Sequence, residues 1–316
     1  LDLDYTGQSK FGGLGSGGSG GRDYDSTAGH TTSPLTEDDS ITKFTASYQM
    51  SEDTLMYYTR SEGYRPGGWN RNAGSTPNCR SYETTNPNYC GGTPGDGTYR
   101  ADIVLAYKSD NVLNNEIGIK TLLMDGKMRL NATWYSIEWT DIQVSQFDPV
   151  HVDFITFIEN AADADISGLE ADMLYYPSDS LTISAAISLN DTEIVNDVAQ
   201  TIPIVDIGNP LPLAPKRQGN VRIRKDLSLN QSYFQAAVKY ASSTYNSFEA
   251  AKVLDQSAYT IVDFAYGLTI NDVDVEFFIR NANDERANLY YNDQDDIPRI
   301  TTNRPRNMGV RMSYRF

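Results

Sequence analysis

The feature that most constrains this chain is a two-residue alternation of apolar and polar side chains. In residues 181–190, apolar side chains occupy the odd positions, and small or polar side chains occupy the even positions. Residues 128–135 and 233–240 alternate in the same way. Because successive side chains of a strand point to opposite faces, this pattern predicts strands with one apolar and one polar face. We count about eleven such strands, or twelve if residues 1–5 end another one.

The lengths of the connections indicate which all-β architecture these strands form. A soluble β-sandwich also alternates, so the periodicity alone leaves that possibility open. Short turns are expected at residues 51–53, 125–126, 177–179, 228–230 and 271–272. Long polar connections separate these hairpins at residues 63–110, 141–165, 191–215, 242–256 and 282–305. This regular alternation of short turns and long connections predicts an antiparallel up-and-down transmembrane β-barrel, with short periplasmic turns and long extracellular loops.

The polar faces of the expected strands carry charges at the depth of a membrane. These charged residues are Glu116, Lys120, Arg129, Glu170, Asp172, Arg222, Arg224, Lys239, Asp263, Glu276 and Arg280. A basic side chain facing lipid at the midplane would cost about 2–4 kcal/mol, so these residues are expected to face the lumen. The mean hydropathy of −0.48 does not oppose a membrane location. A barrel strand crosses with only about 10 residues, of which every second one faces lipid.

Composition excludes several other functions. A formal net charge of −16 opposes nucleic-acid binding, which needs a basic surface. The two histidines, His30 and His151, lie in expected loops without a nucleophile or a cluster of metal ligands nearby, so we expect no enzyme, no cofactor and no metal site. The acidic residues 293–296 do not have the spacing of an EF-hand, and a solvated loop is the simpler interpretation.

The two cysteines and the end of the chain suggest an extracytoplasmic setting. Cys79 and Cys90 are close in sequence within a Gly- and Pro-rich segment, which favours a disulfide over a metal pair because no further ligands are nearby. The last strand alternates up to the final residue. Its Tyr314 and terminal Phe316 resemble the signal that the outer-membrane barrel assembly machinery recognises.

Six segments, in the same order, resemble the C-terminal barrel region of TonB-dependent transporters. They include the turn Arg65–Pro66–Gly67–Gly68 and a segment at 160–170 in which Ala162 replaces the usual Gly. The six segments are residues 55–70, 115–127, 160–170, 211–216, 280–285 and 304–309. No single segment is specific, but the six occur in the family's order and are spread over roughly residues 41–316. The chain is therefore identified as a candidate member of this family.

The resemblance implies an incomplete barrel in the outer membrane of a Gram-negative bacterium. Barrels of this family have about 22 strands, so residues 41–316 would supply half of one. Residues 1–40 are expected to form a Gly/Ser-rich extracellular loop with a strand end at 1–5, and neither the family's plug domain nor its TonB box is recognisable. The implied partners are the TonB complex through the missing N-terminal region, the barrel assembly machinery, outer-membrane lipid and lipopolysaccharide, and a small nutrient ligand.

The resemblance also implies import of a scarce nutrient, with a ferric siderophore ahead of cobalamin or an oligosaccharide. Arg65, Trp69, Asn70, Tyr290 and Tyr291 combine donors with aromatic faces and are the candidate ligand residues. Alternatively, they shape a turn or belong to the interfacial aromatic girdle. Two other protein classes stay open. One is a 12-stranded autotransporter-type translocator, whose pore helix the Gly-rich start could not form, and the other is a soluble β-sandwich binding module.

Overall fold

The structure is a computed structural model. It describes residues 2–5, 35–38, 41–69, 90–91, 100–101, 106–147, 156–199, 204–229, 231–250, 253–292 and 299–314. Within these ranges, no helix is both long and apolar enough to cross a membrane. Strands account for most of the described chain, and every strand pair is antiparallel, which confirms the all-β prediction.

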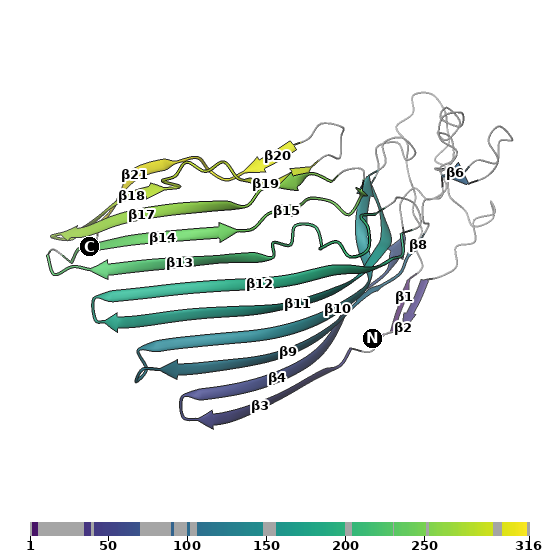
Figure 1. Cartoon of the computed structure of the whole chain (residues 1–316), viewed down its shortest axis with the longest axis horizontal. Helices are drawn as coiled ribbons and strands as arrows, with labels where there is room; N and C mark the ends of the chain where they lie inside the picture. Colours follow the sequence, from purple (N-terminus) through teal and green to yellow (C-terminus); the bar gives the residue numbers. More distant parts are fainter. Residues whose placement is uncertain are drawn as a thin grey trace.

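Eleven strands form one continuous antiparallel sheet, which is a single curved layer (Figure 1). In chain order they are β3 (Lys43–Ser51), β4 (Thr54–Arg65), β9 (Asp110–Leu123), β10 (Met128–Phe147), β11 (Thr156–Ser178), β12 (Leu181–Asp197), β13 (Arg217–Asp226), β14 (Tyr233–Ala241), β17 (Tyr259–Ile270), β18 (Val273–Arg280) and β21 (Asn307–Tyr314). Each strand pairs with the ones before and after it in this series, so the predicted up-and-down topology is confirmed. The edge strands β3 and β21 do not pair with each other in the described chain.

Short strands form five two-stranded ladders outside the main sheet. The ladders are β1 (Asp2–Tyr5) with β2 (Leu35–Asp38), β5 (Gly68–Trp69) with β8 (Ala106–Tyr107), β6 (Cys90–Gly91) with β7 (Arg100–Ala101), β15 (Thr244–Tyr245) with β16 (Asp255–Gln256), and β19 (Asn288–Asn292) with β20 (Arg299–Thr302). Four of these ladders lie within the long connections between main-sheet strands, and β1–β2 precedes the sheet.

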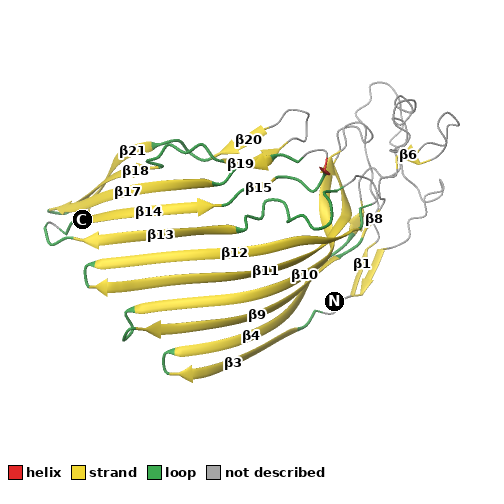
Figure 2. Cartoon of the chain, viewed as in Figure 1, coloured by secondary structure: helices red, strands yellow, loops and turns green. Residues whose placement is uncertain are grey.

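The connections at the two ends of the sheet differ as the sequence predicts. Short turns at residues 52–53, 124–127, 179–180 and 271–272 lie at one end, on the left of Figure 2, together with the described residues 227–229 and 231–232 between β13 and β14. The long connections gather at the opposite end, which we call the outer end. Two expected loops are wrong in part. In 141–165, β10 continues to Phe147 and β11 already begins at Thr156, and in 191–215, β12 continues to Asp197. The β10–β11 hairpin has register shifts around Ile142. Strand segments that extend beyond the bilayer need not alternate apolar and polar side chains, so the sequence pattern does not reveal them.

The register assigns every strand side chain to one of two faces. All eleven charged residues predicted to face the lumen lie on the same face, which we call the charge-bearing face. The opposite, apolar face exposes large hydrophobic side chains along the sheet, among them Trp134, Leu169, Ile187, Val221, Phe234, Phe264, Phe277 and Met308. A band of this extent is unfavourable in water and favourable against lipid, so the two-faced wall fits a membrane barrel.

On the charge-bearing face, an aromatic ring repeatedly lies opposite a glycine of the next strand. Tyr57 is opposite Gly118, and a Cβ added to that glycine would come within 2.4 Å of the tyrosine ring. The same arrangement joins Tyr135 to Gly168, Tyr233 to Gly267 and Phe278 to Gly309. The Tyr57 hydroxyl donates to Glu116 at 2.5 Å. The glycines therefore leave room for rings that fill the wall between charged side chains.

We predict that Gly118→Ala destabilises the sheet, whereas Gly63→Ala does not. The new methyl group at position 118 would overlap the Tyr57 ring, and overpacking of this kind typically costs about 1–3 kcal/mol. At Gly63 an added Cβ meets nothing within 4 Å. The measurement is the temperature at which detergent-extracted protein loses its folded gel mobility. Equal transition temperatures for the two variants would contradict the packing role of the aromatic–glycine pairs.

Candidate functional site

Sequence analysis selects Arg65, and the structure places it in an ion pair at the outer end of the sheet. Arg65 ends β4 and lies opposite Asp110, the first residue of β9. The Arg65 Nε donates to both carboxylate oxygens of Asp110, at 3.0 and 2.8 Å, and Nη2 donates to one of them. Asp110 is 1% exposed, whereas the Arg65 side chain is 53% exposed. The pair therefore has a buried anion and an accessible cation.

Asp110 accepts further hydrogen bonds from two neighbouring strands. The Arg65 backbone N–H donates to it at 3.2 Å, the Trp139 indole N–H at 3.2 Å and the Gln143 backbone N–H at 3.4 Å. The Arg65 guanidinium also lies 5.5 Å from the centre of a Trp139 ring. Because Asp110 accepts hydrogen bonds from the guanidinium, the pKa of Arg65 is raised above its ordinary value, although burial opposes this. A buried carboxylate needs partners of this kind, and here they are all present.

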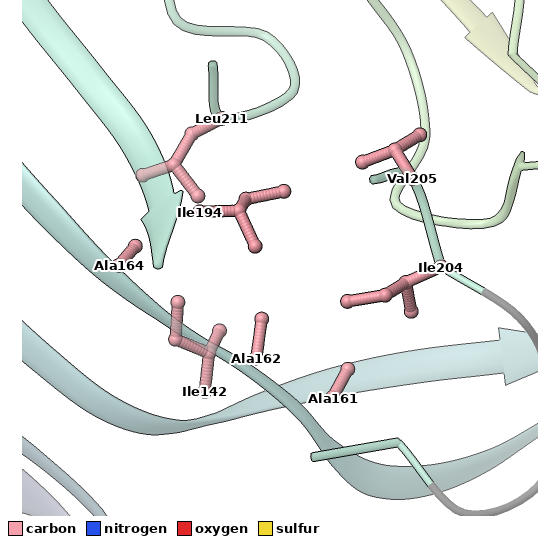
Figure 3. Close-up of a cluster of buried hydrophobic side chains, with 8 residues drawn as sticks. All are labelled: Ile142, Ala161, Ala162, Ala164, Ile194, Ile204, Val205 and Leu211. Carbon is pink, nitrogen blue, oxygen red and sulfur yellow. The ribbon is translucent and has the colours of Figure 1, made fainter. Parts of the chain in front are cut away.

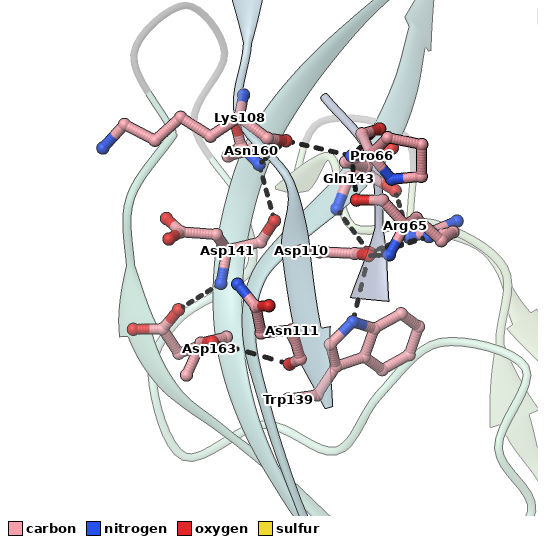
Figure 4. A network of polar contacts seen from close by, with 11 residues as sticks. Arg65, Pro66, Lys108, Asp110, Asn111, Trp139, Asp141, Gln143, Asn160 and Asp163 are labelled. Carbon is pink, nitrogen blue, oxygen red and sulfur yellow. Dashed lines mark hydrogen bonds and ion pairs between the residues drawn. The ribbon is translucent and has the colours of Figure 1, made fainter. Parts of the chain in front are cut away.

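Two amide side chains fasten both ends of the connection at residues 66–109 (Figure 4). Gln143 Nε2 donates to the Pro66 carbonyl at 3.0 Å and to the Lys108 carbonyl at 2.9 Å. Asn160 Nδ2 donates to the Lys108 carbonyl at 3.1 Å, and Asn160 Oδ1 accepts from the Lys108 backbone N–H at 2.8 Å. The long connection therefore leaves and rejoins the sheet at a polar network on β10 and β11, which we call the Asp110 network.

The irregularity in β10 brings these amides into position. Asp141 has a φ of 54°, a left-handed conformation that bends the strand. Its backbone N–H donates to Asp163 at 2.7 Å, and the other oxygen of Asp163 accepts from Asn196 on β12 at 3.0 Å. Polar side chains thus replace the regular ladder at the bulge, which links three strands.

Next to this network, an apolar cluster covers the outer ends of β10, β11 and β12 (Figure 3). Its strand residues Ala164 and Ile194 belong by register to the charge-bearing face. The residues after β12 contribute Ile204, Val205 and Leu211 to the same cluster. The Leu211 backbone N–H donates to Thr192 at 2.9 Å. Residues 204–211 therefore fold back over the charge-bearing face and cover the outer ends of these strands.

Tyr245, from the following connection, holds this folded segment in place. Its hydroxyl donates to the Pro210 carbonyl, and its own carbonyl accepts from the Leu213 backbone N–H at 2.7 Å. The Val205 backbone N–H donates to the Phe248 carbonyl at 2.8 Å. Burial raises the pKa of Tyr245 to about 12. Two successive outer connections thus form one packed unit.

The charge-bearing face is hollowed below these connections. A pocket of about 630 Å³ extends from β10 to β17, and the residues after β18 border it with Leu289 and Asn303. Carboxylates and an amine lie together in this pocket, contributed by Glu170, Asp172 and Lys239. The Asn131 amide donates to Asp172 at 3.0 Å. Charged and amide side chains are thus available in an open hollow of the wall, where they could contact a hydrophilic group.

The other predicted ligand residues are distributed over two edges of the sheet. Tyr290 and Tyr291 lie on β19, between β18 and β21, at the edge opposite to Arg65. Tyr290 is 42% exposed, whereas the Tyr291 hydroxyl accepts from Asn288 at 2.6 Å. The backbone of Trp69 pairs with Ala106. Asn70 lies outside the described residues.

The remaining sequence predictions stay predictions. Cys90 begins β6 and pairs through its backbone with Ala101, but Cys79 lies outside the described residues. Tyr314 is on the apolar face of β21 and is 60% exposed, and Phe316 lies outside the described residues. In the described ranges, no group of three or more His, Cys, Asp or Glu side chains could hold a metal ion. The acidic residues 293–296 also lie outside those ranges.

The family model described as "TonB dependent receptor-like, beta-barrel" matches residues 7–282. The chain belongs to this receptor family. The resemblance seen in the sequence is thus confirmed, and the outer membrane of a Gram-negative bacterium is its location. The family also fits better than an autotransporter-type translocator or a soluble sandwich. The charge-bearing face is therefore the lumen wall of the receptor barrel, and the apolar face is its lipid surface.

Solved receptor structures share the fold of this receptor chain. It is similar to the ferric yersiniabactin uptake receptor FyuA from Yersinia pestis, with a TM-score of 0.64, 17% identity, and coverage of 89% of this chain and 38% of that one. It is also similar to the siderophore receptor PiuA from Acinetobacter baumannii, with a TM-score of 0.61, 18% identity, and coverage of 85% of this chain and 35% of that one. For the ferric-catecholate import receptor Fiu from E. coli K12, the TM-score is 0.63 and the identity 16%, with coverage of 98% of this chain and 40% of that one. The chain thus spans well under half the length of these receptors.

We predict that Asp110→Ala loosens the connection at 66–109 while the receptor wall stays folded. The substitution removes the acceptor of Arg65, Trp139 and Gln143, and donors left without a partner in a buried site cost about 1–3 kcal/mol. Limited proteolysis should then cleave within residues 66–109 at least several times faster. The neighbouring Asn111→Ala is the matched control. Equal cleavage rates in both variants would contradict an anchoring role for Asp110.

We also predict that Tyr245 ionises only at unusually high pH. The phenol keeps its proton to about pH 12 in the folded receptor, against about 10 for a free tyrosine. Its stabilising contribution is complete below pH 10 and is lost as the pH rises toward 12. The ultraviolet titration difference between the wild type and Tyr245→Phe should have its midpoint near 12. A midpoint near 10 would show that the phenol is exposed to water.

Proposed function

We propose that this chain forms part of the barrel wall of a receptor that imports a ferric siderophore across the outer membrane with energy from TonB. The observation that carries the proposal is the outer end of the lumen wall. There, the Asp110 network holds both ends of the connection at residues 66–109, and the apolar cluster holds residues 204–211, with Arg65 and Tyr290 exposed. The solved structures of similar fold include receptors named for ferric yersiniabactin and ferric catecholate, which supports this class of ligand.

The chemistry of the exposed side chains suits such a ligand. A ferric siderophore is larger than most metabolites and presents carboxylate, catecholate or hydroxamate oxygens around the iron. An arginine donates to such oxygens, and tyrosines stack on flat rings and donate hydrogen bonds. We propose that Arg65, Trp69, Asn70, Tyr290 and Tyr291 contact the ligand from two sides of the opening. Arg65 suits this role because Asp110 fixes its orientation while half of its side chain stays exposed.

The lumen wall suggests what the rest of the receptor must supply. Eleven charged strand residues need water or protein beside them, and a plug domain with a TonB-binding segment would provide this in the whole receptor. We propose that residues 41–316 form the C-terminal part of the barrel and that residues 1–40 belong to an extracellular loop. The ligand would enter through the outer connections and leave past the plug once TonB acts.

Uptake measurements test the nutrient class. A Gram-negative strain that lacks its own siderophore receptors would express the receptor carrying this chain, with growth on single ferric siderophores as the sole iron source. We predict uptake of ⁵⁵Fe from at least one siderophore, which deletion of tonB abolishes. Parallel arms supply cobalamin and a maltodextrin. If only cobalamin or only the maltodextrin is taken up in a TonB-dependent way, the siderophore proposal is wrong and that nutrient is the transported ligand.

The exposed aromatic residue of β19 allows a sharper test. We predict that Tyr290→Ala weakens binding of the transported ligand about tenfold, because an aromatic contact contributes about 1–1.5 kcal/mol. Ile300→Ala on the paired strand β20 is the control, since Ile300 is similarly exposed, at 49%, but offers neither ring nor donor. Binding is measured by fluorescence quenching on whole cells. Unchanged affinity in Tyr290→Ala would remove this residue from the site while leaving the import function open.

A further inference from the structure

Three neighbouring strands of the lumen wall carry positive charge and no negative charge over much of their height. The register aligns β12, β13 and β14 side by side, in four rows of three lumen-facing positions (Figure 1). Three of these side chains are cations, and none is a carboxylate. From the outer end toward the turn end, the rows are Ser188, Gln218 and Ala241; Ala186, Asn220 and Lys239; Ser184, Arg222 and Ala237; and Thr182, Arg224 and Gln235. We call this part of the wall the basic strip.

The three cations of the basic strip follow one another down the wall. Arg222 and Arg224 are two residues apart on β13, and Lys239 of β14 lies opposite Asn220, which is two residues before Arg222. Two residues of a strand span about 7 Å along the wall, which is less than the screening distance of about 8 Å in physiological salt. In the described part of the chain, neither Arg222 nor Lys239 forms an ion pair. The strip therefore presents a continuous line of positive potential to the lumen.

This positive charge contrasts with the rest of the chain, whose formal net charge is −16. Carboxylates face the lumen on the strands at either side of the strip. They are Glu170 and Asp172 on β11, and Asp263 on β17. Asp172 accepts from the Asn131 amide at 3.0 Å, and Asp263 accepts from the Asn281 backbone N–H at 2.7 Å. These two carboxylates are thus held toward partners outside the strip.

The basic strip joins two hollows of the lumen wall. At its outer end, Lys239 and Asn220 line the hollow of about 630 Å³ described above. At its turn end, Arg224 lines a second hollow of about 480 Å³, to which β21 contributes Arg311. Arg222 lies in the row between the two hollows. An anion that moves from the outer hollow toward the periplasmic turns thus passes a cation in each successive row.

In the turn-end hollow, two arginines are oriented while their charges stay accessible. The Arg224 guanidinium lies 3.7 Å from the centre of the Tyr233 ring, and its Nε donates to Asp226 at 2.9 Å. Arg311 Nη1 donates to Glu276 at 3.2 Å, and the Tyr233 hydroxyl donates to the same carboxylate at 2.5 Å. The side chains of Arg224 and Arg311 are 40% and 57% exposed. Each guanidinium therefore keeps further N–H donors for an anion in the hollow.

We propose that the basic strip guides an anionic ferric complex along the lumen wall, from the outer hollow to the turn-end hollow. The inference rests on the proposed import function, and it adds the net charge of the ligand and the side of the barrel that the ligand follows. A ferric triscatecholate is such an anion, because the charges of its oxygen ligands exceed that of the iron, whereas a ferric trihydroxamate is neutral. A row of cations concentrates an anion beside it, and exposed ion pairs are weak enough to release it again. The strip thus suits transit more than capture.

The first test asks which charge the imported complex carries. The whole receptor that carries this chain is expressed in a strain without its own siderophore receptors. Uptake of ⁵⁵Fe is measured with ferric enterobactin and ferric citrate as anionic probes and with ferrichrome as the neutral probe. We expect TonB-dependent uptake of at least one anionic probe and none of ferrichrome. Uptake of ferrichrome alone would overturn the strip and still confirm import of a ferric siderophore. Uptake of no probe would also overturn the strip, and the wider panel of siderophores would then decide the import function separately.

Variants of the strip separate transit from binding. Arg222→Gln combined with Lys239→Gln should slow uptake of the anionic probe about tenfold, because focused positive potentials raise encounter rates by at least that factor. The affinity of the probe for cells that lack TonB should stay within about twofold, since the outer connections are distant from these positions. The charge-conserving pair Arg222→Lys and Lys239→Arg should restore the rate of uptake.

Lys120→Gln combined with Arg129→Gln is the matched control. It also removes two lumen-facing cations, but from β9 and β10, outside the strip, and Arg129 lies in the same row of the register as Arg222. Its rate of uptake should equal that of the wild type. Equal slowing in the control and the strip variant would show a general effect of lumen charge and overturn the strip.

Two further readouts exclude a purely structural role for the strip. Heat-dependent gel mobility checks that the barrel is folded, and entry of vancomycin checks that the lumen is still filled. Slower uptake with wild-type vancomycin entry supports the proposal. Increased vancomycin entry in the strip variant would show that the cations hold the protein inside the barrel, and unchanged uptake would show that they guide nothing. If the double variant does not assemble, Arg222→Gln and Lys239→Gln are compared singly, and wild-type uptake in both would refute the strip.

Discussion

The backbone hydrogen bonds between neighbouring strands are the interaction on which this structure depends. A bilayer offers no water to unpaired N–H and C=O groups, so each strand must find its partners in the adjacent strands. The eleven strands therefore pair in sequence order from β3 to β21. Once the ladder fixes the register, each side chain has only two possible environments, lipid or lumen. This is why the wall has no central core of its own, and why exposed Trp134 and Phe277 stabilise it.

Outside the bilayer this constraint ends, and the chain folds by the rules of soluble proteins. At the outer ends of β10, β11 and β12, apolar side chains such as Ile194 turn to the lumen side and pack under residues 204–211. Asp110 becomes fully buried there because five donor groups from Arg65, Trp139 and Gln143 surround its carboxylate. The same strands thus serve as a membrane wall along most of their length and as a support for the outer connections at their ends.

The sequence predicts the part of the fold that the bilayer controls. Alternation placed Glu116, Arg222 and Glu276 on the correct face, and the short turns, such as the one at residues 271–272, occur where they were expected. It failed where the bilayer has no influence, because the polar residues 141–147 read as loop although they continue β10. Asp110 was missed as well. Its partner Arg65 is 45 residues away, and only the β4–β9 register brings the two together.

Register also explains how one strand can serve two unrelated surfaces. β13 carries three arginines, of which Arg222 and Arg224 have the parity of the lumen and Arg217 has the parity of the lipid face. From composition alone, Arg217 is one more charge of a polar strand end. Its place at the outer end of β13 makes it different, because a charge with the parity of the lipid face is tolerated only near the membrane interface. A shift of β13 by one residue would exchange these roles. The ladder that builds the wall therefore also decides which arginine faces the lumen and which one lies on the lipid face.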